Sequence, residues 1–575
     1  MEKQHNRGQD GAGVVAVKLN VEPGYPFLQR IRSNANQPIV DIFTKINSEV
    51  AELAKYQPDI AQHPGLMKGH ISFLGELLLG HLRYGTQGRN NVEFCHPFIK
   101  RDTIPARTLA LAGNFNLVNT DELFALVNID PGDFQKQSDL AAMMEVIHHF
   151  IVKSDEQSPG NLDVINLLKK AVSLFDGGFT VGGLLGNGDA FVFRDANGIR
   201  PAYYFISDEV IVAASERAAI RTVFNVGENE VQELMPGMGL VVKGDGDISV
   251  EEILPPKERR ACSFERIYFS RGSDEKIYRE RSALGYNLTE QVLTAINHDL
   301  KNTIFSFIPN TAEVAFYGLW KGMDDYLKEI KIQRILSWGN QIDKEKLAEM
   351  INRKIRIEKI AIKDVKMRTF ITEDVSRNEM VQHVYDITYG TVIKGQDTLV
   401  VIDDSIVRGT TLKESIVRML ARLEPKKIIV VSSAPQIRYP DCYGIDMSKL
   451  GDFIAFKAAI SLMKESGKEC CLQQIYEKCK EMQRTGQLNS ENMVRQVYKP
   501  FTAEKIADKI ATLITPKEVS IPVEVIFQTI ESLHKACPTN TGDWYFTGNY
   551  PTTGGNRVVN KAFINYMEGR DVRGY

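Results

Sequence analysis

The sequence has few cysteines, little net charge and no long apolar run. Its seven cysteines form no Cys-x-x-Cys pair and are odd in number, which argues against a disulfide framework and favours reduced thiols. The formal charge of -3 gives no general reason to expect nucleic acid or membrane as a partner. No stretch approaches the length of a membrane-spanning helix, and the start, MEKQHNRGQD, has no apolar signal core. We therefore expect a cytoplasmic protein.

Two common phosphate-binding signatures are also missing. The chain has no G-x-x-x-x-G-K-[ST] P-loop and no G-x-G-x-x-G that opens a helix. A phosphate site in this protein must therefore rest on another arrangement of residues.

The length of 575 residues is too great for one core, so two large domains with an added terminal segment are expected. Apolar and polar residues alternate between Gly, Asn and Asp turns in the first part, which predicts antiparallel hairpins at 109–119, 177–195, 203–215 and 238–250. The apolar spacing at 139–152 predicts a helix with one buried stripe. A Pro pair and a charge run at 253–262 predict a linker. We predict domains at 1–255, 256–465 and 466–575, the last a helical extension and tail.

The second part alternates helices and strands. Continuous apolar runs at 398–402 and 426–435 are typical of parallel strands covered on both faces. The segment 325–366 is rich in Lys, Glu and Ile and predicts a helical insertion.

The stretch TLVVIDDSIVRGTTLKESI, residues 398–416, joins such a strand to an amphipathic helix. Leu412, Ile416, Met419, Leu420 and Leu423 share one face of that helix. Unpaired N–H groups at the helix start favour an anion, Gly409 lets the backbone close around it, and the neighbouring threonines add hydroxyl donors. The turn is therefore predicted to hold a phosphate group.

Asp403 and Asp404 precede this turn and would repel a phosphate. They suit a ligand that also offers hydroxyl donors or a divalent metal, such as a ribose diol or Mg²⁺ on the same sugar. The competing interpretation is that the pair begins a turn and caps the helix. The complete strand, acid pair, Gly-Thr-Thr turn and helix favour the binding interpretation.

At these residues the sequence resembles the phosphoribosyl-diphosphate (PRPP) motif of type I phosphoribosyltransferases, in the form found in amidophosphoribosyltransferases. Further matches to that family follow in order, namely RGQDGAG, GHLRYGTQG, RDANGIRP, ASERAAI, PGMGLVV, CSFERIYFSR, RTFI, IRYPDCYGIDM and FTGNYPT. The resemblance implies an α+β Ntn-hydrolase-type glutaminase sandwich, followed by an α/β phosphoribosyltransferase domain with a parallel sheet.

The resemblance also implies an activity. Ammonia, released from glutamine or taken up free, would displace pyrophosphate from C1 of PRPP and give phosphoribosylamine, the first committed step of purine synthesis. Mg²⁺ would be the cofactor. Purine nucleotides as feedback inhibitors and assembly into a homo-oligomer are further expectations from the family.

The phosphoribosyl half supplies one set of expected site residues. The resemblance makes Asp403 and Asp404 the catalytic acids that hold ribose and metal, and Ser405 with Arg408, Gly409, Thr410 and Thr411 the binders of the 5′-phosphate. Arg368, in RTFI, would lie on a catalytic loop that closes over PRPP.

The glutaminase half supplies a second set. By resemblance Arg83 would bind the α-carboxylate of glutamine and Asp139 its α-amino group, while Asn114 and the backbone N–H of Phe115 would form the oxyanion hole. Phe115 stands where the family has Gly, which crowds the approach.

The sequence departs from the family at the glutaminase nucleophile. The family uses an N-terminal cysteine whose α-amine assists the thiol. This sequence begins at Met1, and Cys95, the nearest cysteine, lies past RYGT where the family has no nucleophile. Either the cellular protein is longer, or the chain uses free ammonia.

The phosphoribosyl half departs as well. Asn310 stands where an acid is usual, and Gln382 and Val384 lie where basic residues are expected; His383 or Lys366 could compensate. The alternative to an active enzyme is therefore a catalytically impaired PRPP-binding regulatory paralogue. A salvage phosphoribosyltransferase acting on a base is a weaker third interpretation.

Some members of the family carry an iron–sulfur cluster on four cysteines. Here Cys262 matches one of these positions, Asp441 occupies another, and Gly542 and Tyr545 occupy the remaining pair. No cluster is expected.

Overall fold

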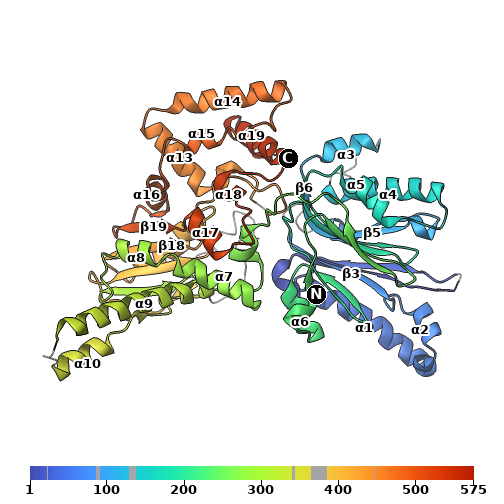
Figure 1. Ribbon diagram of the computed structural model, residues 1–575, viewed down its shortest axis with the longest axis horizontal. Helices are drawn as coiled ribbons and strands as arrows, with labels where there is room; N and C mark the ends of the chain where they lie inside the picture. The colour runs from blue at the N-terminus through green and yellow to red at the C-terminus, as the bar shows by residue number, and fades with distance from the viewer. Residues whose placement is uncertain are drawn as a thin grey trace.

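The computed structural model describes residues 1–22, 24–85, 91–127, 138–339, 343–363, 385–445 and 447–574. The chain forms two lobes that meet along a central junction, with the C-terminus beside that junction (Figure 1). None of the helices in these ranges has the length and apolar character that a bilayer crossing requires.

Two stacked antiparallel sheets form the N-terminal lobe. The first has the order β2-β1-β3 and the second the order β12-β11-β7-β6-β5-β4. Their strands are β1 (Gly11–Val17), β2 (Leu28–Ser33), β3 (Leu77–Arg83), β4 (Phe98–Lys100), β5 (Leu109–Leu117), β6 (Gly177–Leu185), β7 (Ala190–Arg194), β11 (Met238–Val242) and β12 (Ile248–Glu252). The predicted hairpins at 177–195 and 238–250 are present as β6–β7 and β11–β12.

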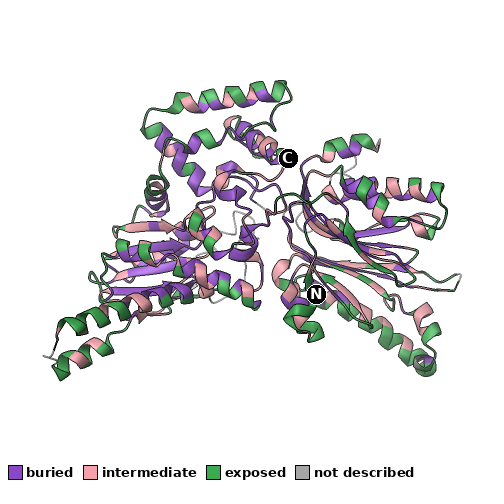
Figure 2. Ribbon diagram, viewed as in Figure 1, coloured by how far each residue is buried: buried purple, intermediate pink, exposed green. Residues whose placement is uncertain are grey.

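Helices cover both outer faces of this sandwich. Along β1, Val15 faces the second sheet while Val14 packs against Ile42 of α1 (Pro38–Tyr56), because successive strand residues point to opposite faces. α4 (Asp139–Gln157) and α5 (Val164–Val172) cover the other sheet with their apolar stripes. The outward faces of α1 and α4 are largely exposed (Figure 2). The order of layers is therefore helix, sheet, sheet, helix.

Smaller elements complete this lobe. A short sheet has the order β10-β8-β9 and packs on α6. The bounds are β8 (Tyr203–Ile206), β9 (Ile211–Ala214), β10 (Gln232–Glu233), α2 (Pro64–His70), α3 (Thr120–Leu126), α6 (Arg217–Phe224), η1 (Glu2–Arg7), η2 (Pro58–Gln62), η3 (Val92–Phe94), η4 (Pro105–Arg107) and η6 (Glu228–Glu230).

A parallel sheet in the order β14-β13-β17-β18-β19 forms the centre of the second lobe. Its strands are β13 (Thr303–Phe307), β14 (Arg356–Ile357), β17 (Thr398–Asp403), β18 (Lys427–Ser432) and β19 (Val523–Phe527), and a separate ribbon pairs β15 (Ala361–Lys363) with β16 (Tyr385–Ile387). The predicted parallel pairing of the two apolar runs is confirmed in β17 and β18.

Helices lie on both faces of this parallel sheet. Val400 and Ile402 pack against α8 (Thr289–Ala295) and α9 (Glu313–Ser337), whereas Leu399 and Val401 face the opposite side. Alternate residues of one strand therefore serve two cores, which is why the run is continuously apolar. Within the predicted helical insertion at 325–366, the end of α9 and α10 (Lys344–Asn352) are helical and project from the lobe (Figure 1). The prediction is wrong at 356–357 and 361–363, which form the strands β14 and β15.

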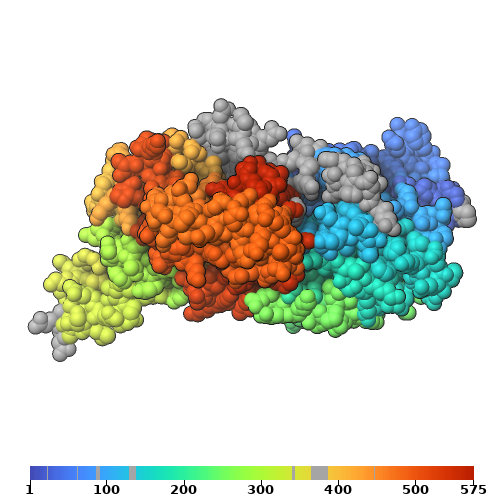
Figure 3. Space-filling model, turned by 90° about the horizontal axis from the view of Figure 1, so that it is seen from above, coloured from blue at the N-terminus to red at the C-terminus, as the bar shows by residue number. Residues whose placement is uncertain are grey.

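The remaining helices of this lobe include those of the C-terminal part. Their bounds are η7 (Glu265–Phe269), α7 (Glu275–Tyr286), η8 (Leu412–Val417), α12 (Arg418–Ala421), η9 (Leu450–Asp452), α13 (Ile454–Glu465), α14 (Glu469–Arg484), α15 (Arg495–Tyr498), α16 (Ala503–Ile514), α17 (Ile530–Ala536), α18 (Trp544–Thr547) and α19 (Thr553–Met567). Seen from above, the red C-terminal residues lie where the orange helices meet the N-terminal lobe (Figure 3).

Residues 466–575 are not separate from the parallel sheet. β19 pairs with β18, so this segment supplies an edge strand of the sheet in addition to helices. α19 also reaches the other lobe, where Arg557 forms an ion pair with Glu122 at 2.6 Å. A division at residue 465 therefore cuts through one hydrogen-bonded sheet and one core, and the segment predicted as a helical extension and tail also contains the strand β19.

Candidate functional sites: two cavities on either side of the lobe junction

A cavity of about 670 Å³ lies at the carboxyl end of β17. Its wall includes the whole predicted turn from Asp403 to Thr411. Other parts of the wall come from the N-terminal segment, the linker after η7, the 308–311 loop and Lys363. The structure thus brings the acid pair and the predicted phosphate-binding turn to one cavity.

The two carboxylates lie side by side at the start of the turn. The backbone N–H of Asp404 donates to Asp403 Oδ1 at 2.9 Å, and Ser405 Oγ donates to Asp404 Oδ1 at 2.9 Å. Burial raises the pKa of Asp404 to about 6, while Ser405 and the Arg281 guanidinium act in the opposite direction. Burial and the neighbouring acid raise the pKa of Asp403 well above its usual value. A ligand that supplies hydroxyl donors or a cation would relieve this repulsion.

The turn that follows leaves its backbone amides open. Gly409 has φ +72, a conformation that L side chains rarely adopt, and it turns the chain into the helix at Thr410. Within the described chain, the N–H groups of Arg408, Gly409, Thr410 and Thr411 donate to no protein acceptor. The Arg408 guanidinium is paired with Asp452 at 3.1 Å. The open amides point to an anion site built from the main chain.

The helix after the turn differs from the expected regular α-helix. It runs as a π-helical segment, η8, before it continues as α12. The predicted apolar face is nevertheless buried, at Leu412, Ile416, Met419, Leu420 and Leu423. A π-turn widens the helix next to the cavity, a feature common at functional sites.

Several other residues of this cavity were not predicted from the sequence. Thr311 hydrogen-bonds the Asp404 carboxylate, and the Arg281 charge acts on it from α7. His5, Asn6 and Gln9 reach the cavity from the N-terminal segment. No local motif marks these residues, because only the tertiary fold brings them to β17.

Asn310, the predicted departure from the family pattern, lies in the wall of this cavity, after a cis peptide bond to Pro309. The predicted closing-loop residue Arg368 lies outside the described residues. The same holds for Lys366, Gln382, His383 and Val384.

A second cavity of about 360 Å³ opens in the N-terminal lobe. It gathers all four residues predicted for the glutaminase half, namely Arg83, Asn114, Phe115 and Asp139. Among the described residues of its wall there is no cysteine, and Cys95 is fully buried nearby. Burial raises the pKa of the Cys95 thiol, so it stays protonated at neutral pH.

Two charged residues of this second cavity, Arg83 and Asp139, come from different elements. Arg83, at the end of β3, donates to the Asn91 carbonyl at 3.2 Å and lies 5.8 Å from the Phe94 ring centroid. Asp139 opens α4 and accepts a hydrogen bond from the Leu117 N–H at 2.9 Å. Burial raises the pKa of Asp139 to about 6, so a cationic ligand group would stabilise its ionised form. A guanidinium and a carboxylate that line one cavity suit an α-amino acid.

Two histidines beside the predicted oxyanion hole were missed by the sequence analysis. His81 Nε2 lies 3.1 Å from the Gly113 carbonyl oxygen, and its ring lies 4.2 Å from that of His96. Burial lowers the pKa of His81 to about 4 and that of His96 well below its usual value. Both rings are therefore neutral near pH 7 and extend the polar wall without adding charge.

A thin wall separates the two cavities. Along η1, Gln4 and Arg7 line the second cavity while His5 and Asn6 line the first. Phe269, the last residue of η7, lines both cavities. The two sites therefore share structural elements.

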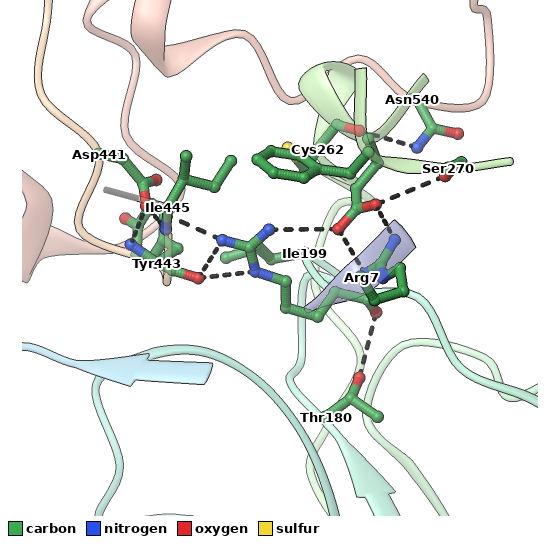
Figure 4. Close-up of polar contacts among 12 residues, drawn as sticks. Arg7, Thr180, Ile199, Cys262, Ser270, Asp441, Tyr443, Ile445 and Asn540 are labelled. Carbon is green, nitrogen blue, oxygen red and sulfur yellow. Dashed lines mark hydrogen bonds and ion pairs between the residues drawn. The ribbon is translucent and has the colours of Figure 1, made fainter. Parts of the chain in front are cut away.

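A buried ionic network runs through this junction (Figure 4). Glu265 pairs with Arg7 at 2.6 Å and with Arg200 at 3.3 Å. Arg200 continues to Asp441 at 3.8 Å and donates to the Tyr443 carbonyl. Charges from four distant parts of the sequence thus neutralise one another inside the protein.

The positions matched to cluster cysteines also meet at this junction. Cys262 Sγ lies 3.3 Å from the Tyr545 hydroxyl, and Cys262 forms a backbone bridge with Gly542. Asp441 accepts a hydrogen bond from Trp544 Nε1 at 3.0 Å. In the described part of the chain, no group of three or more His, Cys, Asp and Glu side chains is placed to hold a metal ion.

The fold is that of two-domain glutamine amidotransferases that act on PRPP. The chain matches the structure of glutamine PRPP amidotransferase from Bacillus subtilis, complexed with ADP and GMP, with a TM-score of 0.63 at 23% identity over 96% of this chain and 93% of that one. A structure titled as the allosteric regulatory enzyme of purine biosynthesis matches with a TM-score of 0.62 at 22% identity, over 96% and 91% of the two chains. The predicted fold class is confirmed.

Curated relatives of this chain share one enzyme name, amidophosphoribosyltransferase. The amidophosphoribosyltransferase of Pasteurella multocida is 27% identical over 79% of this chain and 78% of its own length, and that of Bacillus subtilis is 27% identical over 80% of each. The yeast enzyme, from Saccharomyces cerevisiae, is 26% identical over 66% of this chain and 70% of its own. No protein-family profile matches the chain. The relatives confirm the predicted resemblance to amidophosphoribosyltransferases.

Proposed function

We propose that this protein transfers ammonia to C1 of PRPP, giving 5-phosphoribosylamine and pyrophosphate, as in the first committed step of purine synthesis. One observation carries the proposal. A carboxylate pair and a row of open backbone amides line the same cavity, at the end of β17. The relatives with the same activity in their names support it.

In the first cavity, the two ends of the turn bind different parts of the ligand. The N–H groups of Arg408 to Thr411 donate hydrogen bonds to the 5′-phosphate, since unpaired N–H groups at a helix start attract an anion. Asp403 and Asp404 accept hydrogen bonds from the ribose hydroxyls. Holding both ends of the sugar fixes C1, and fixed orientation lowers the barrier to substitution at that carbon.

The acid pair also fits Mg²⁺. Carboxylate oxygens are the ligands that Mg²⁺ prefers. The pKa values of Asp403 and Asp404 are raised, so a bound cation would stabilise their ionised forms. Bound Mg²⁺ supplies charge neutralisation for the leaving pyrophosphate. Thr311 and the positive charge of Arg281 lower the pKa of Asp404, which favours its ionised form.

The second cavity serves an amino acid, and glutamine is the proposed ligand. Arg83 binds its α-carboxylate, Asp139 its α-ammonium group, and the Asn114 side chain with the Phe115 N–H the side-chain carbonyl oxygen. The amine donor for the first cavity is ammonia, either free or released from glutamine.

Regulation, assembly and location complete the proposal. The solved relative in complex with ADP and GMP supports purine nucleotides as feedback ligands. We further propose a homo-oligomer and a cytoplasmic location, the latter supported by seven free cysteines. No nucleic-acid or membrane partner is proposed.

Pyrophosphate release tests the activity. Purified protein with PRPP, Mg²⁺ and ammonium at pH 8 is expected to release pyrophosphate, and Asp403→Asn and Asp404→Asn should each reduce the rate by roughly 10²-fold or more, through lost positioning and charge. Asp245→Asn is the matched control, because Asp245 is exposed in the turn between β11 and β12. This variant should retain the rate of pyrophosphate release.

Two outcomes would point elsewhere. Calorimetric binding of PRPP without turnover would favour the impaired regulatory paralogue, for which Asn310 in the cavity wall is the supporting observation. Turnover with a purine or pyrimidine base in place of ammonia would indicate a salvage enzyme. Glutamine should be tried alongside ammonium to identify the amine donor.

A further inference from the structure

Arg281, in α7, is a buried arginine that lines the first cavity. The residue is only 6% exposed. Its Nε donates to the Arg266 carbonyl at 2.8 Å, and Nη2 donates to the carbonyls of Tyr268 at 3.1 Å and Ser270 at 2.7 Å. Three hydrogen bonds to one stretch of backbone therefore hold the guanidinium in a fixed position.

This guanidinium forms no ion pair with any carboxylate in the described part of the chain. The three carbonyl oxygens carry only partial charge, so the positive charge of Arg281 has no full counter-charge. Two other arginines of the junction are paired, Arg266 with Glu280 at 3.1 Å and Arg217 with Asp274 at 2.9 Å. Buried charges in proteins are normally paired, so an unpaired one in the wall of a cavity favours an anionic ligand.

One nitrogen of Arg281 is open to the cavity. Nη1 donates to no acceptor among the described residues, and protein atoms do not fully enclose it. A Cβ on Gly272, which also lines the cavity, would lie 3.4 Å from Nη1 and 3.9 Å from Val314 Cγ2. Nη1 therefore lies near the start of α9, which follows the 308–311 loop.

This position is at the acid end of the turn. Thr311, in the 308–311 loop, hydrogen-bonds the Asp404 carboxylate, whereas the open amides begin at Arg408. In the proposed function, the acids hold the ribose hydroxyls and the amides hold the 5′-phosphate. The diphosphate of PRPP is attached to C1, next to the hydroxyl-bearing C2, and the 5′-phosphate lies on the other side of the ring. A cation at the acid end therefore faces the diphosphate.

We propose that Arg281 is a further substrate-binding residue, whose Nη1 donates to the diphosphate of PRPP and supplies positive charge beside this leaving group. The inference rests on the proposed function in one respect, the assignment of this cavity to PRPP. The sequence places Gln382 and Val384 where basic residues are expected. A fixed cation on α7 supplies charge that these two side chains lack.

Calorimetry with three ligands tests this contact. PRPP and pyrophosphate, each with Mg²⁺, contain the diphosphate, whereas ribose 5-phosphate has the sugar and the 5′-phosphate without it. Arg281→Gln is expected to weaken binding of PRPP and pyrophosphate by about 10- to 100-fold, the effect of one charge-assisted hydrogen bond. Binding of ribose 5-phosphate should be unchanged.

Arg279→Gln is the matched control, because it is the same substitution in the same helix. Arg279 is exposed and pairs with Glu275, so binding of all three ligands should be unchanged. Unfolding midpoints of all variants report whether the lobe stays folded.

A second variant leaves Arg281 and its three backbone hydrogen bonds in place. Gly272→Asp puts a carboxylate within reach of Nη1, since the added Cβ would lie in ordinary contact with it. This carboxylate would compete with the diphosphate, so PRPP and pyrophosphate should bind at least about tenfold more weakly, and ribose 5-phosphate should be affected far less. Gly272→Ala adds the Cβ alone and should retain binding. If Arg281→Gln does not fold, these two variants decide the question.

Three results would overturn the inference. Equal weakening of all three ligands in Arg281→Gln would mean that Arg281 only supports the wall of the cavity. Unchanged PRPP binding in Arg281→Gln or in Gly272→Asp would mean that Nη1 does not contact the ligand. Absence of both PRPP and pyrophosphate binding in the parent protein would mean that the cavity takes no diphosphate.

Ammonia-dependent pyrophosphate release, measured on the same preparations, separates this inference from the proposed function. Release by the parent protein, with PRPP binding that does not depend on Arg281, overturns only the role of Arg281. PRPP binding that depends on Arg281, without release, overturns only the proposed transfer reaction.

Discussion

Arg7 and Glu265 form a two-point ion pair, in which Nη1 donates to Oε2 at 2.6 Å and Nη2 donates to Oε1 at 3.0 Å. Arg7 belongs to the N-terminal segment and Glu265 to the linker that opens the second lobe. Burial opposes ionisation of Glu265, but Arg7 and Arg200 hold its pKa below the usual value. This pair therefore fastens the two lobes at the wall between the cavities.

Removal of the Glu265 carboxylate should destabilise the junction strongly. Glu265→Ala leaves buried Arg7 with only Glu216, at 3.6 Å, and buried Arg200 with only Asp441, at 3.8 Å. Loss of one partner of a buried ion pair typically lowers the free energy of unfolding by about 3–5 kcal/mol. Urea unfolding measures the loss.

The control for this change is Glu258→Ala. Glu258 pairs with Arg260 at 2.8 Å but is 72% exposed, so its removal should change the free energy of unfolding by less than about 1 kcal/mol. Equal losses in the two variants would show that the junction pair contributes no more than a surface pair.

The acid pair predicts a pH dependence of the reaction with PRPP. Asp404, with a pKa near 6 raised by burial, must be ionised to accept hydroxyl donors or Mg²⁺. We expect kcat/KM for PRPP to fall as the pH drops through about 6, because kcat/KM reports groups of the free enzyme. A profile that is flat from pH 8 to about pH 5 would contradict this reading of the site.

The same raised pKa predicts that Asp404 lowers stability at neutral pH in the absence of ligand. A carboxyl whose pKa is higher in the folded than in the unfolded state binds its proton more tightly when folded, so folding is favoured below both values and weakened above them. Asp404→Asn should therefore raise the unfolding midpoint at pH 7.5, and the gain should shrink as the pH falls from about 6 toward 4. Asp245→Asn, exposed in a turn, should show no such gain.

Gly409 is expected to be required for PRPP binding. A Cβ there would lie 3.1 Å from atoms of Ile454 and Ile514, and φ is +72, so Gly409→Ala would shift the open amides. We expect KM for PRPP to rise by about tenfold or more, as one lost charge-assisted contact would cause. Gly395→Ala is the control, with φ +67 and open space around its Cβ, and should retain the KM. A similar rise in both variants would attribute the effect to general backbone strain.

The positions of the cluster cysteines are predicted to hold no iron. Purified protein should show no stoichiometric iron or sulfide, and EDTA should leave the unfolding midpoint unchanged. Stoichiometric iron, or visible absorbance that EDTA removes, would refute this prediction.

Asp441→Ala should lower the free energy of unfolding by about 2–4 kcal/mol. It removes the acceptor of the Tyr443 N–H, at 3.0 Å, and of Trp544 Nε1.

Residues 398–423 show how much of the structure the local sequence pattern predicts. The strand, the acid pair, the turn and the buried helical face are all encoded within this stretch, because a strand-turn-helix unit is made by neighbours in sequence. The same local logic predicted the β6–β7 hairpin and the apolar stripe of α4. The π-turn in η8 was not predicted, since its hydrogen-bond spacing depends on packing beyond the stretch itself.

The edge strand β19 shows where local pattern fails. Its sequence, VEVIF, is short and lies within a charged, mostly helical part of the chain, so nothing local reveals that it completes a sheet with β18. Parallel pairing joins residues far apart in sequence, and only the closed fold brings them together. The four-part ionic network at the junction was missed for the same reason.

The sequence by itself determined the acid pair and its turn, because these depend on short spacings. Its resemblance to a known family indicated the charged groups that would suit an amino acid. Only the tertiary structure decided that Asp404 meets Thr311 and Arg281, and that one wall of η1 and linker divides the two cavities. Contacts of that kind join segments hundreds of residues apart, and their geometry is set by how the lobes pack and not by any local pattern.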